Sequence, residues 1–141
     1  MARGLTIVLD NEAIQALMDP GHRKHRQVVT YVESASARNM RRAGWMRLIV
    51  PTTVRAEAAW DRRAPSAARI NGMKIADAVL DKGAADRAAK VCETLGVSVA
   101  DAHIAAVLTD TEGPHSVVTS DRKDLRRIAT HLGIKVEIVA V

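Results

Sequence analysis

The stretch that decides the fold is "TIVLDNEAIQALM", residues 6–18. Its first four residues are β-branched or apolar without interruption, which is typical of a strand buried on both faces of a parallel sheet. Three polar residues follow at once, and apolar residues then recur at helical spacing. The sequence therefore predicts a strand over residues 6–9 that carries a carboxylate, Asp10, at its carboxyl end, and a helix over residues 13–18.

The composition predicts a single folded domain, residues 1–141, with an aliphatic core. Hydrophobic residues make up 48% of the chain, which is enough for a packed interior, whereas aromatic residues make up 2% and Phe is absent. This scarcity of rings argues against modules that stack bases on an aromatic sheet face. Cys92 is the only cysteine, so the chain cannot form an internal disulfide or a thiolate metal site, and we expect Cys92 in the core.

The charge of the chain favours an anionic partner. Its formal net charge is +5 and its pI is about 9.9, which points to nucleic acid, although a basic protein without such a partner is the plain alternative. The start, "MARGLTIVLD", lacks the apolar stretch of a signal peptide, and no segment is long and apolar enough to span a bilayer. We therefore expect a cytoplasmic protein without membrane contact.

Short apolar runs alternate with helical patterns along the rest of the chain. We expect further strands at 47–50, 75–80, 116–119 and 136–139, and further helices at 22–42, from 52 onward, at 84–95, 98–110 and 121–132. The segment "DRRAPSAARING" predicts a surface turn followed by a short helix. This alternation is typical of an α/β fold with a mainly parallel central sheet and helices on both faces, a three-layer α/β/α sandwich.

Four acids lie where predicted strands pass into helices. Asp10 directly follows one predicted strand, and Asp121 comes just after "SVVTS" at the end of another. Asp101 lies in the first turn of a helix, and Glu57 lies one turn into the helix after residues 47–50. Each acid taken alone is explained as a helix cap or a solvated helix residue. Ligands of open parallel sheets bind beyond the carboxyl ends of the strands, however, so these acids are expected to converge there.

A convergence of carboxylates favours a cation. Like charges in one pocket raise each other's pKa unless a cation joins them. Because the four acids have no His or Cys partner in the pattern, a hard cation such as Mg²⁺ or Mn²⁺ suits them better than Zn²⁺. The sequence thus predicts a magnesium or manganese site at one edge of the sheet.

Four pieces of the sequence, spread over essentially the whole chain, form one ordered pattern: "IVLDNEAIQAL", "VPTTVRAEAAW", "VSVADAHIAAVL" and "SVVTSDRKDLRRIA". In these pieces the sequence resembles the PIN-domain nucleases, especially the small VapC-type toxins of toxin–antitoxin modules. The resemblance implies a PIN-like fold and a metal-dependent endoribonuclease that leaves a 5′-phosphate and a 3′-hydroxyl. The metal ligands and catalytic residues that it implies are Asp10, Glu57, Asp101 and Asp121, holding one or two ions.

Two further acids stand close to this set. Glu12 occupies a position where many family members have a small polar residue, so it is either an additional carboxylate in the pocket or an ordinary first-turn residue. Asp124 matches the family pattern more weakly than Asp121 does. Of the two histidines in "GHRKHRQ", neither is expected to bind metal, and His103 is expected on a different side of its helix from Asp101.

Basic residues near the acids are candidates for contacts with RNA phosphates. The candidates are Arg55, Arg122, Lys123, Arg126 and Arg127, with a second cluster in "GHRKHRQ". The alternative is a solvated helix face, which is the commoner reason for a run of charges. Contacts with phosphates predict an affinity for RNA that falls steeply with salt.

The resemblance also implies a cognate antitoxin that blocks the acidic pocket, and a homodimer. Three other readings remain open at this point. The chain could be a stand-alone RNA-processing nuclease, a PIN-like module that binds RNA or protein without cutting, or an α/β receiver or phosphatase with an aspartate after its first strand. A phosphatase requires an Asp where Glu12 stands, so this last reading is the weakest.

Overall fold

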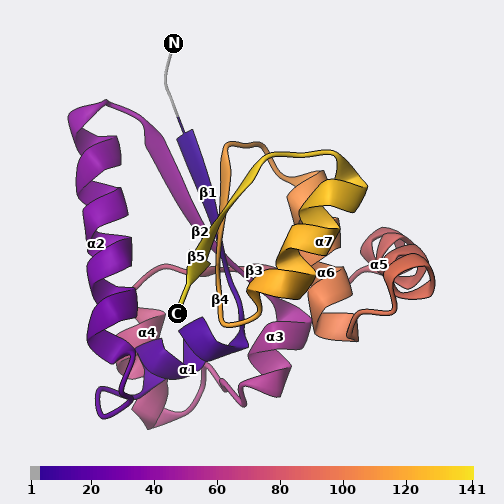
Figure 1. Ribbon diagram of the computed structural model, residues 1–141. Coiled ribbons are helices and arrows are strands. Elements are labelled where there is room, and N and C mark those ends of the chain that lie inside the picture. Colours follow the sequence, from indigo (N-terminus) through magenta and orange to yellow (C-terminus); the bar gives the residue numbers. More distant parts are fainter. Residues whose placement is uncertain (1–3) are drawn as a thin grey trace.

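The computed structural model describes residues 4–141, which form one five-stranded, all-parallel sheet with helices on both faces (Figure 1). The strands are β1 (Gly4–Leu9), β2 (Trp45–Pro51), β3 (Ala76–Ala78), β4 (His115–Thr119) and β5 (Val136–Ala140). The helices are α1 (Asn11–Met18), α2 (His25–Arg41), α3 (Thr52–Glu57), α4 (Ala68–Asn71), α5 (Lys82–Leu95), α6 (Val99–Asp110) and α7 (Arg122–Leu132), with a short 3-10 helix, η1 (Pro65–Ala67). The predicted three-layer α/β/α sandwich with a parallel sheet is confirmed.

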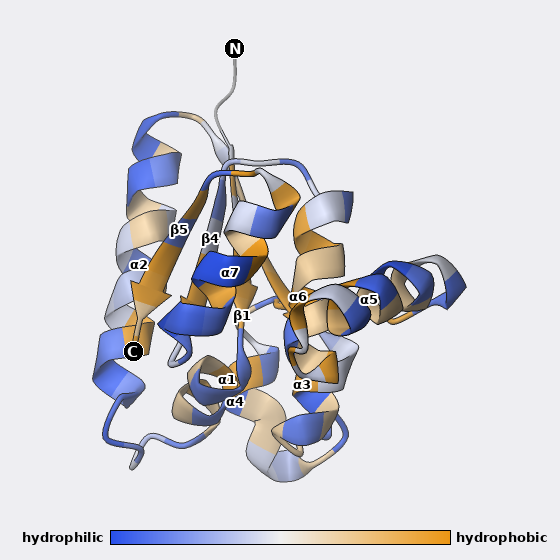
Figure 2. Cartoon of the chain, turned by 45° about the vertical axis from the view of Figure 1, so that its right-hand side comes forward, coloured by the Kyte–Doolittle hydropathy of each residue, from blue (hydrophilic) through white to orange (hydrophobic). Residues whose placement is uncertain are grey.

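The core lies on both faces of the central strand. Ile7, Val8 and Leu9 of β1 have no exposed surface, as the uninterrupted apolar run predicts for a strand covered on both sides. Helix α6 is buried at every position from Ala100 to Leu108, because it packs between the sheet, α5 and α7. Figure 2 shows the orange strands inside and the blue outer surfaces of α2 and α7.

The order of the strands creates a reversal point beside β1. In the order β3-β2-β1-β4-β5, the chain leaves β1 toward β2 on one side, whereas β4 leads to β5 on the other. Right-handed crossovers that run in opposite directions place their helices on opposite faces, and α2 and α7 lie accordingly on the two sides of the sheet in Figure 1. Ligands of such sheets bind at the reversal point, beyond the carboxyl ends of the two strands. Here those ends lead into Asp10 and Asp121.

Two predicted elements, the helix at 22–42 and the strand at 75–80, are shorter in the structure than predicted, and the helix predicted from residue 52 onward is brief. Helix α2 begins at His25 instead of residue 22, because Asp19 accepts a hydrogen bond from the N–H of Gly21 and holds the preceding residues in a turn. Helix α3 ends at Glu57, and the positive φ of Ala59 (56°) turns the chain away. The predicted strand at 75–80 is reduced to three residues of β3, which pair only with the end of β2.

The structure also bears on the expected burial of Cys92 and on the expected lack of a membrane-spanning segment. Cys92 is half-buried against the core instead of fully enclosed. Within residues 4–141, no helix combines the length and the apolar character needed to cross a membrane. The expectation that the start of the chain lacks the apolar stretch of a signal peptide concerns residues 1–3 in part, and these lie outside the described residues.

Candidate metal centre

Asp10 is held rigidly at the end of β1. It is only 8% exposed, and it caps α1 by accepting a 2.7 Å hydrogen bond from the N–H of Asn11 through Oδ1. Its Oδ2 accepts a 2.6 Å hydrogen bond from the hydroxyl of Thr119, the last residue of the neighbouring strand β4. The cap reading of Asp10 is therefore correct, and the second oxygen is fixed toward the reversal point at the same time.

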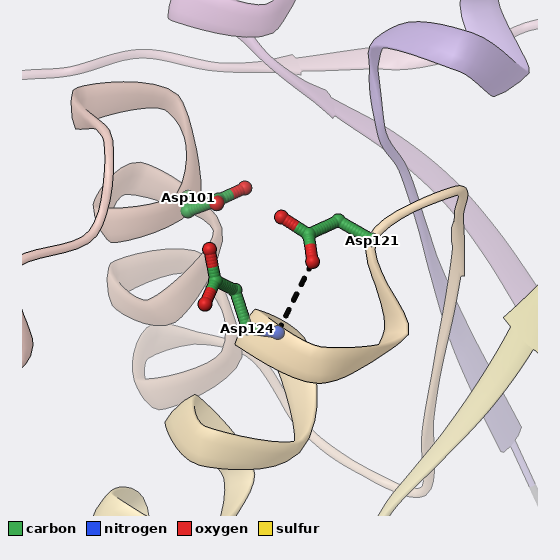
Figure 3. A group of neighbouring side chains, drawn as sticks. All are labelled: Asp101, Asp121 and Asp124. Atoms are coloured by element: carbon green, nitrogen blue, oxygen red, sulfur yellow. Dashed lines mark hydrogen bonds between the residues drawn. The ribbon is translucent and has the colours of Figure 1, made fainter.

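Three further carboxylates meet beside this strand end. Asp101, Asp121 and Asp124 each place one oxygen so that all three oxygens lie within 4.8 Å of one another (Figure 3). Asp121 caps α7 by accepting a 3.1 Å hydrogen bond from the N–H of Asp124, which fixes the two relative to each other. Asp101 comes from the first turn of α6, where Ser98 caps the helix through the Asp101 N–H at 3.1 Å.

Burial and the negative charges of the neighbouring acids raise the pKa of Asp101. The pKa of Asp101 is raised from 3.8 to about 6, mainly by burial, and further by the negative charges of Asp10, Asp121 and Asp124. A hydrogen bond from Ser98 opposes the shift in pKa only in part. Four acidic groups therefore lie close enough to act on one another, and their mutual repulsion favours the binding of a cation.

The donor set fits a hard divalent cation. All the donors in the group are carboxylate oxygens, which Mg²⁺ and Mn²⁺ prefer. Oxygen atoms on opposite sides of a Mg²⁺ ion are about 4 Å apart, and one oxygen of each of the three carboxylates lies within 4.8 Å of the others. Asp101, Asp121 and Asp124, with Asp10 beside them, are therefore the residues that could hold such an ion.

The structure separates Glu57 and Glu12 from this group. Glu57 is exposed at the end of α3, and within residues 4–141 the group of acids that lie close enough to share an ion does not include it. Glu12 forms ion pairs with Lys24 at 3.1 Å and with His22 at 3.5 Å, so its carboxylate faces the turn before α2. Of the two doubtful acids in the sequence pattern, Asp124 thus joins the group and Glu12 does not.

The basic candidates fall into two kinds. Arg55 forms an ion pair with Asp77 at 3.2 Å, so its charge is used to hold α3 against β3. Arg122, Lys123 and Arg126 are exposed on α7, the helix that starts beside the acids.

Arg127 differs from these three neighbours because two of its guanidinium nitrogens have partners within the protein. It contacts Asp124 at 3.1 Å and donates a 2.6 Å hydrogen bond to the backbone carbonyl of Leu95, which ties α7 to the end of α5. Arg122, Lys123 and Arg126, which have no such partners among the described residues, are therefore the basic residues of α7 that are free to meet phosphate groups.

Two polar contacts, one at the site and one on the far side of α6, are not apparent from the sequence pattern. Thr119 joins Asp10 to Asp121, because its hydroxyl also accepts a 2.9 Å hydrogen bond from the Asp121 N–H. The only sequence signal for this link is the Thr-x-Asp spacing. His103 has no exposed surface, and its Nδ1 is joined by a 2.8 Å hydrogen bond to the hydroxyl of Thr53 in α3, on a side of α6 away from Asp101. Burial lowers the pKa of His103.

Comparison with known proteins finds a likeness in fold to a solved structure. No protein-family model matches the sequence, and no curated protein matches it either. Among solved structures, the chain is similar to a chain in the VapBC2 complex of Rickettsia felis bound to a DNA fragment from its promoter. The TM-score is 0.58, and the match covers 94% of this chain and 98% of the other. The two proteins share a fold. At 10% identity the likeness extends to the PIN-like three-layer architecture and no further.

Proposed function

We propose that this protein is a metal-dependent endoribonuclease, built as a single PIN-like domain, and the toxin of a toxin–antitoxin module that acts in the cytoplasm. The observation that carries the proposal is the group of Asp101, Asp121 and Asp124 beside Asp10, at the reversal point of the sheet. The likeness in fold to a chain of the VapBC2 complex supports the module reading, and the net charge of +5 supports an RNA substrate.

Carboxylates in this arrangement suit metal-assisted hydrolysis of a phosphodiester. A bound Mg²⁺ or Mn²⁺ ion lowers the pKa of a coordinated water and neutralises charge on the phosphoryl oxygens. Asp101, Asp121 and Asp124 would hold the ion, and Asp10 would add a fixed carboxylate at the strand end. No residue of the chain needs to form a covalent intermediate, and cleavage leaves a 5′-phosphate and a 3′-hydroxyl.

The chain's own residues supply rigidity and substrate binding. Asp10 cannot swing away from the site, because Asn11 and Thr119 each hold one of its oxygens. A fixed ligand avoids reorganisation when the substrate binds. The exposed Arg122 and Lys123 begin α7 beside the acids, where they would bind the phosphates next to the one that is cut.

The proposal includes partners as well as chemistry. A cognate antitoxin would bind the toxin and cover the acidic pocket, and the toxin would form a homodimer. Coexpression tests this directly, because growth arrest by the active protein should be relieved by the product of a neighbouring antitoxin gene. An unaffected growth rate in the presence of active protein would contradict the module reading.

A cleavage assay with matched variants tests the nuclease itself. The purified protein should cut single-stranded RNA in Mg²⁺ or Mn²⁺ and stop when a chelator is added. Asp101→Asn should lower the rate by about a hundredfold or more, since it removes a charge from the group that would hold the ion. Asp86→Asn, an exposed aspartate of α5, is the control and should keep full activity. Equal rates for the two variants would reject this site.

A further inference from the structure

Strand β5 is an edge of the sheet with one side free. It pairs with β4, and the order of the strands ends there. The N–H of Val141 donates a 3.0 Å hydrogen bond to the carbonyl of Thr119 in β4, and backbone N–H and C=O groups change sides at each residue of a strand. The backbone groups of every second residue of β5, namely Val136, Ile138 and Ala140, therefore point away from the sheet.

Most of these outward groups lack a partner. The side-chain amide of Gln27 donates a 3.3 Å hydrogen bond to the carbonyl of Ala140, which agrees with the outward direction of that carbonyl. Within residues 4–141, no hydrogen bond reaches the outward N–H and C=O groups of Val136 and Ile138. The opposite edge strand, β3, has only three residues, a length that protects an edge, whereas β5 has five. Unpaired groups on an edge strand are a template for pairing with another chain.

Open grooves flank β5 on both faces of the sheet. The α7 groove, of about 680 Å³, is lined by residues of α7 and by the half-buried Val136 and Ile138. The α2 groove, of about 500 Å³, is lined by residues of α2, among them Tyr31, and by Glu137. Figure 2 shows β5 between these two helices. Because successive side chains of a strand point to opposite faces, a strand added along β5 would place its side chains in the two grooves in turn.

Both grooves carry more positive than negative charge. Arg38 and Arg41, one turn apart on α2, are exposed in the α2 groove, where Glu137 is the one acid. Arg126 and Lys135 are exposed in the α7 groove, which has no acid in its lining. None of the four cations forms an ion pair among the described residues. A second copy of the chain would bring the same cations to this edge, so the charges disfavour pairing of β5 with itself and favour an acidic partner.

We propose that β5 binds an extended, acidic segment of a partner protein, which adds to the sheet as a sixth strand. The backbone of the segment pairs with the outward groups of Val136 and Ile138, which is how peptides bind at sheet edges generally. Its acidic side chains meet Arg38 and Arg41 in the α2 groove, and its apolar side chains pack on Ile138 in the α7 groove. The segment is thus a strand in which acidic and apolar residues alternate, and its binding requires no metal ion.

The probe is a short fluorescent peptide in which Glu and Val alternate, measured by anisotropy in a chelator. The wild-type protein should bind it, and a peptide with Lys in place of Glu should not bind. The affinity should fall about tenfold or more in Arg38→Glu/Arg41→Glu, because both arginines would then repel the peptide. The matched control is Arg69→Glu/Lys74→Glu, which makes the same change of charge at exposed positions in α4 and before β3. Its affinity should stay within about twofold of wild type.

Two further measurements test the backbone pairing. The same peptide is methylated on the backbone nitrogens of every Glu or of every Val, and one of the two forms should bind about tenfold more weakly, because one set of N–H groups faces β5. Hydrogen exchange of the Val136 and Ile138 amides should slow when the unmethylated peptide binds.

Four results would overturn the inference. These are a wild-type protein that does not bind the Glu–Val peptide, an unchanged affinity in Arg38→Glu/Arg41→Glu, full affinity for both methylated peptides, and unchanged exchange at Val136 and Ile138. Slower exchange of these two amides at rising protein concentration, without peptide, would assign the edge to a second copy instead. Loss of RNA binding in Arg38→Glu/Arg41→Glu, with no binding of the peptide to wild type, would assign the grooves to RNA.

Discussion

The hydroxyl of Thr119 donates a 2.6 Å hydrogen bond to the carboxylate of Asp10, across the boundary between β4 and β1. The same hydroxyl accepts a hydrogen bond from the N–H of Asp121 at 2.9 Å. One buried side chain thereby connects the two acids that follow the two strands at the reversal point. The geometry of the candidate metal centre depends on this connection.

Replacement of Thr119 tests the connection. Thr119→Val keeps the volume but leaves a buried oxygen of Asp10 without its donor, so the free energy of unfolding should fall by about 1–3 kcal/mol. Binding of Mn²⁺ should weaken as well, because Asp10 gains freedom to rotate. Urea denaturation and Mn²⁺ titration measure the two effects, with Thr119→Ser as the control that retains the hydroxyl. Wild-type values in Thr119→Val would show that the link is dispensable.

Asp101 makes the stability of the protein depend on pH. Its pKa is raised from 3.8 to about 6 in the folded protein, so the folded state binds this proton more tightly than the unfolded chain does. The stability from this group is fully present below about pH 4 and is lost as the pH rises through about 6. At neutral pH without divalent cations, Asp101→Asn should therefore be more stable than wild type, by about 2 kcal/mol.

Urea denaturation in a chelator, at several pH values between about 4 and 7, measures this difference. The gap between Asp101→Asn and wild type should grow with pH, while Asp86→Asn should follow wild type throughout. A gap that stays constant with pH would mean that the charge of Asp101 is not its source.

Divalent cations should stabilise the protein more at neutral pH than in acid. An ion that binds only the folded state adds about 2.7 kcal/mol at a hundred times its Kd, which raises Tm. The rise should shrink at about pH 5, because protons then compete for Asp101. Thermal unfolding with and without Mn²⁺ measures this increase in Tm, and the Asp121→Asn variant should lose most of the increase. If Asp121→Asn responds to Mn²⁺ as wild type does, the ion binds elsewhere.

Helix α7 should contribute to RNA affinity through charge. Each phosphate contact made with single-stranded RNA adds about 0.7 to the slope of log affinity against log salt, so the variant Arg122→Gln/Lys123→Gln should flatten that slope by up to about 1.4. Binding to an uncleavable RNA in the presence of a chelator, at several salt concentrations, gives the slope. Arg42→Gln is the control, because Arg42 precedes β2 and lies at the opposite edge of the sheet. Equal slopes in all three proteins would assign RNA binding to another surface.

The sequence by itself determined the architecture and most of the acids at its edge. The uninterrupted apolar run of residues 6–9 required a strand covered on both faces, and the alternation of strands with helices required a parallel sheet. Asp10 follows one strand directly and Asp121 lies two residues after another, so the sequence places both acids at strand ends, whereas their meeting also requires β1 and β4 to be neighbours in the sheet. Local pattern suffices for the positions at strand ends, since strand burial and strand-to-helix junctions depend on neighbours in the sequence.

Only the tertiary structure decided which charges are free and which are engaged. Glu12 forms an ion pair with Lys24 and so faces away from the site, and Arg55 forms an ion pair with Asp77. Asp124 lies close to Asp101, although Asp124 matches the family motif only weakly. Each of these outcomes depends on elements that come together only when the chain folds. An ion pair is a short-range interaction between side chains, so its partners are fixed by packing and not by spacing along the sequence.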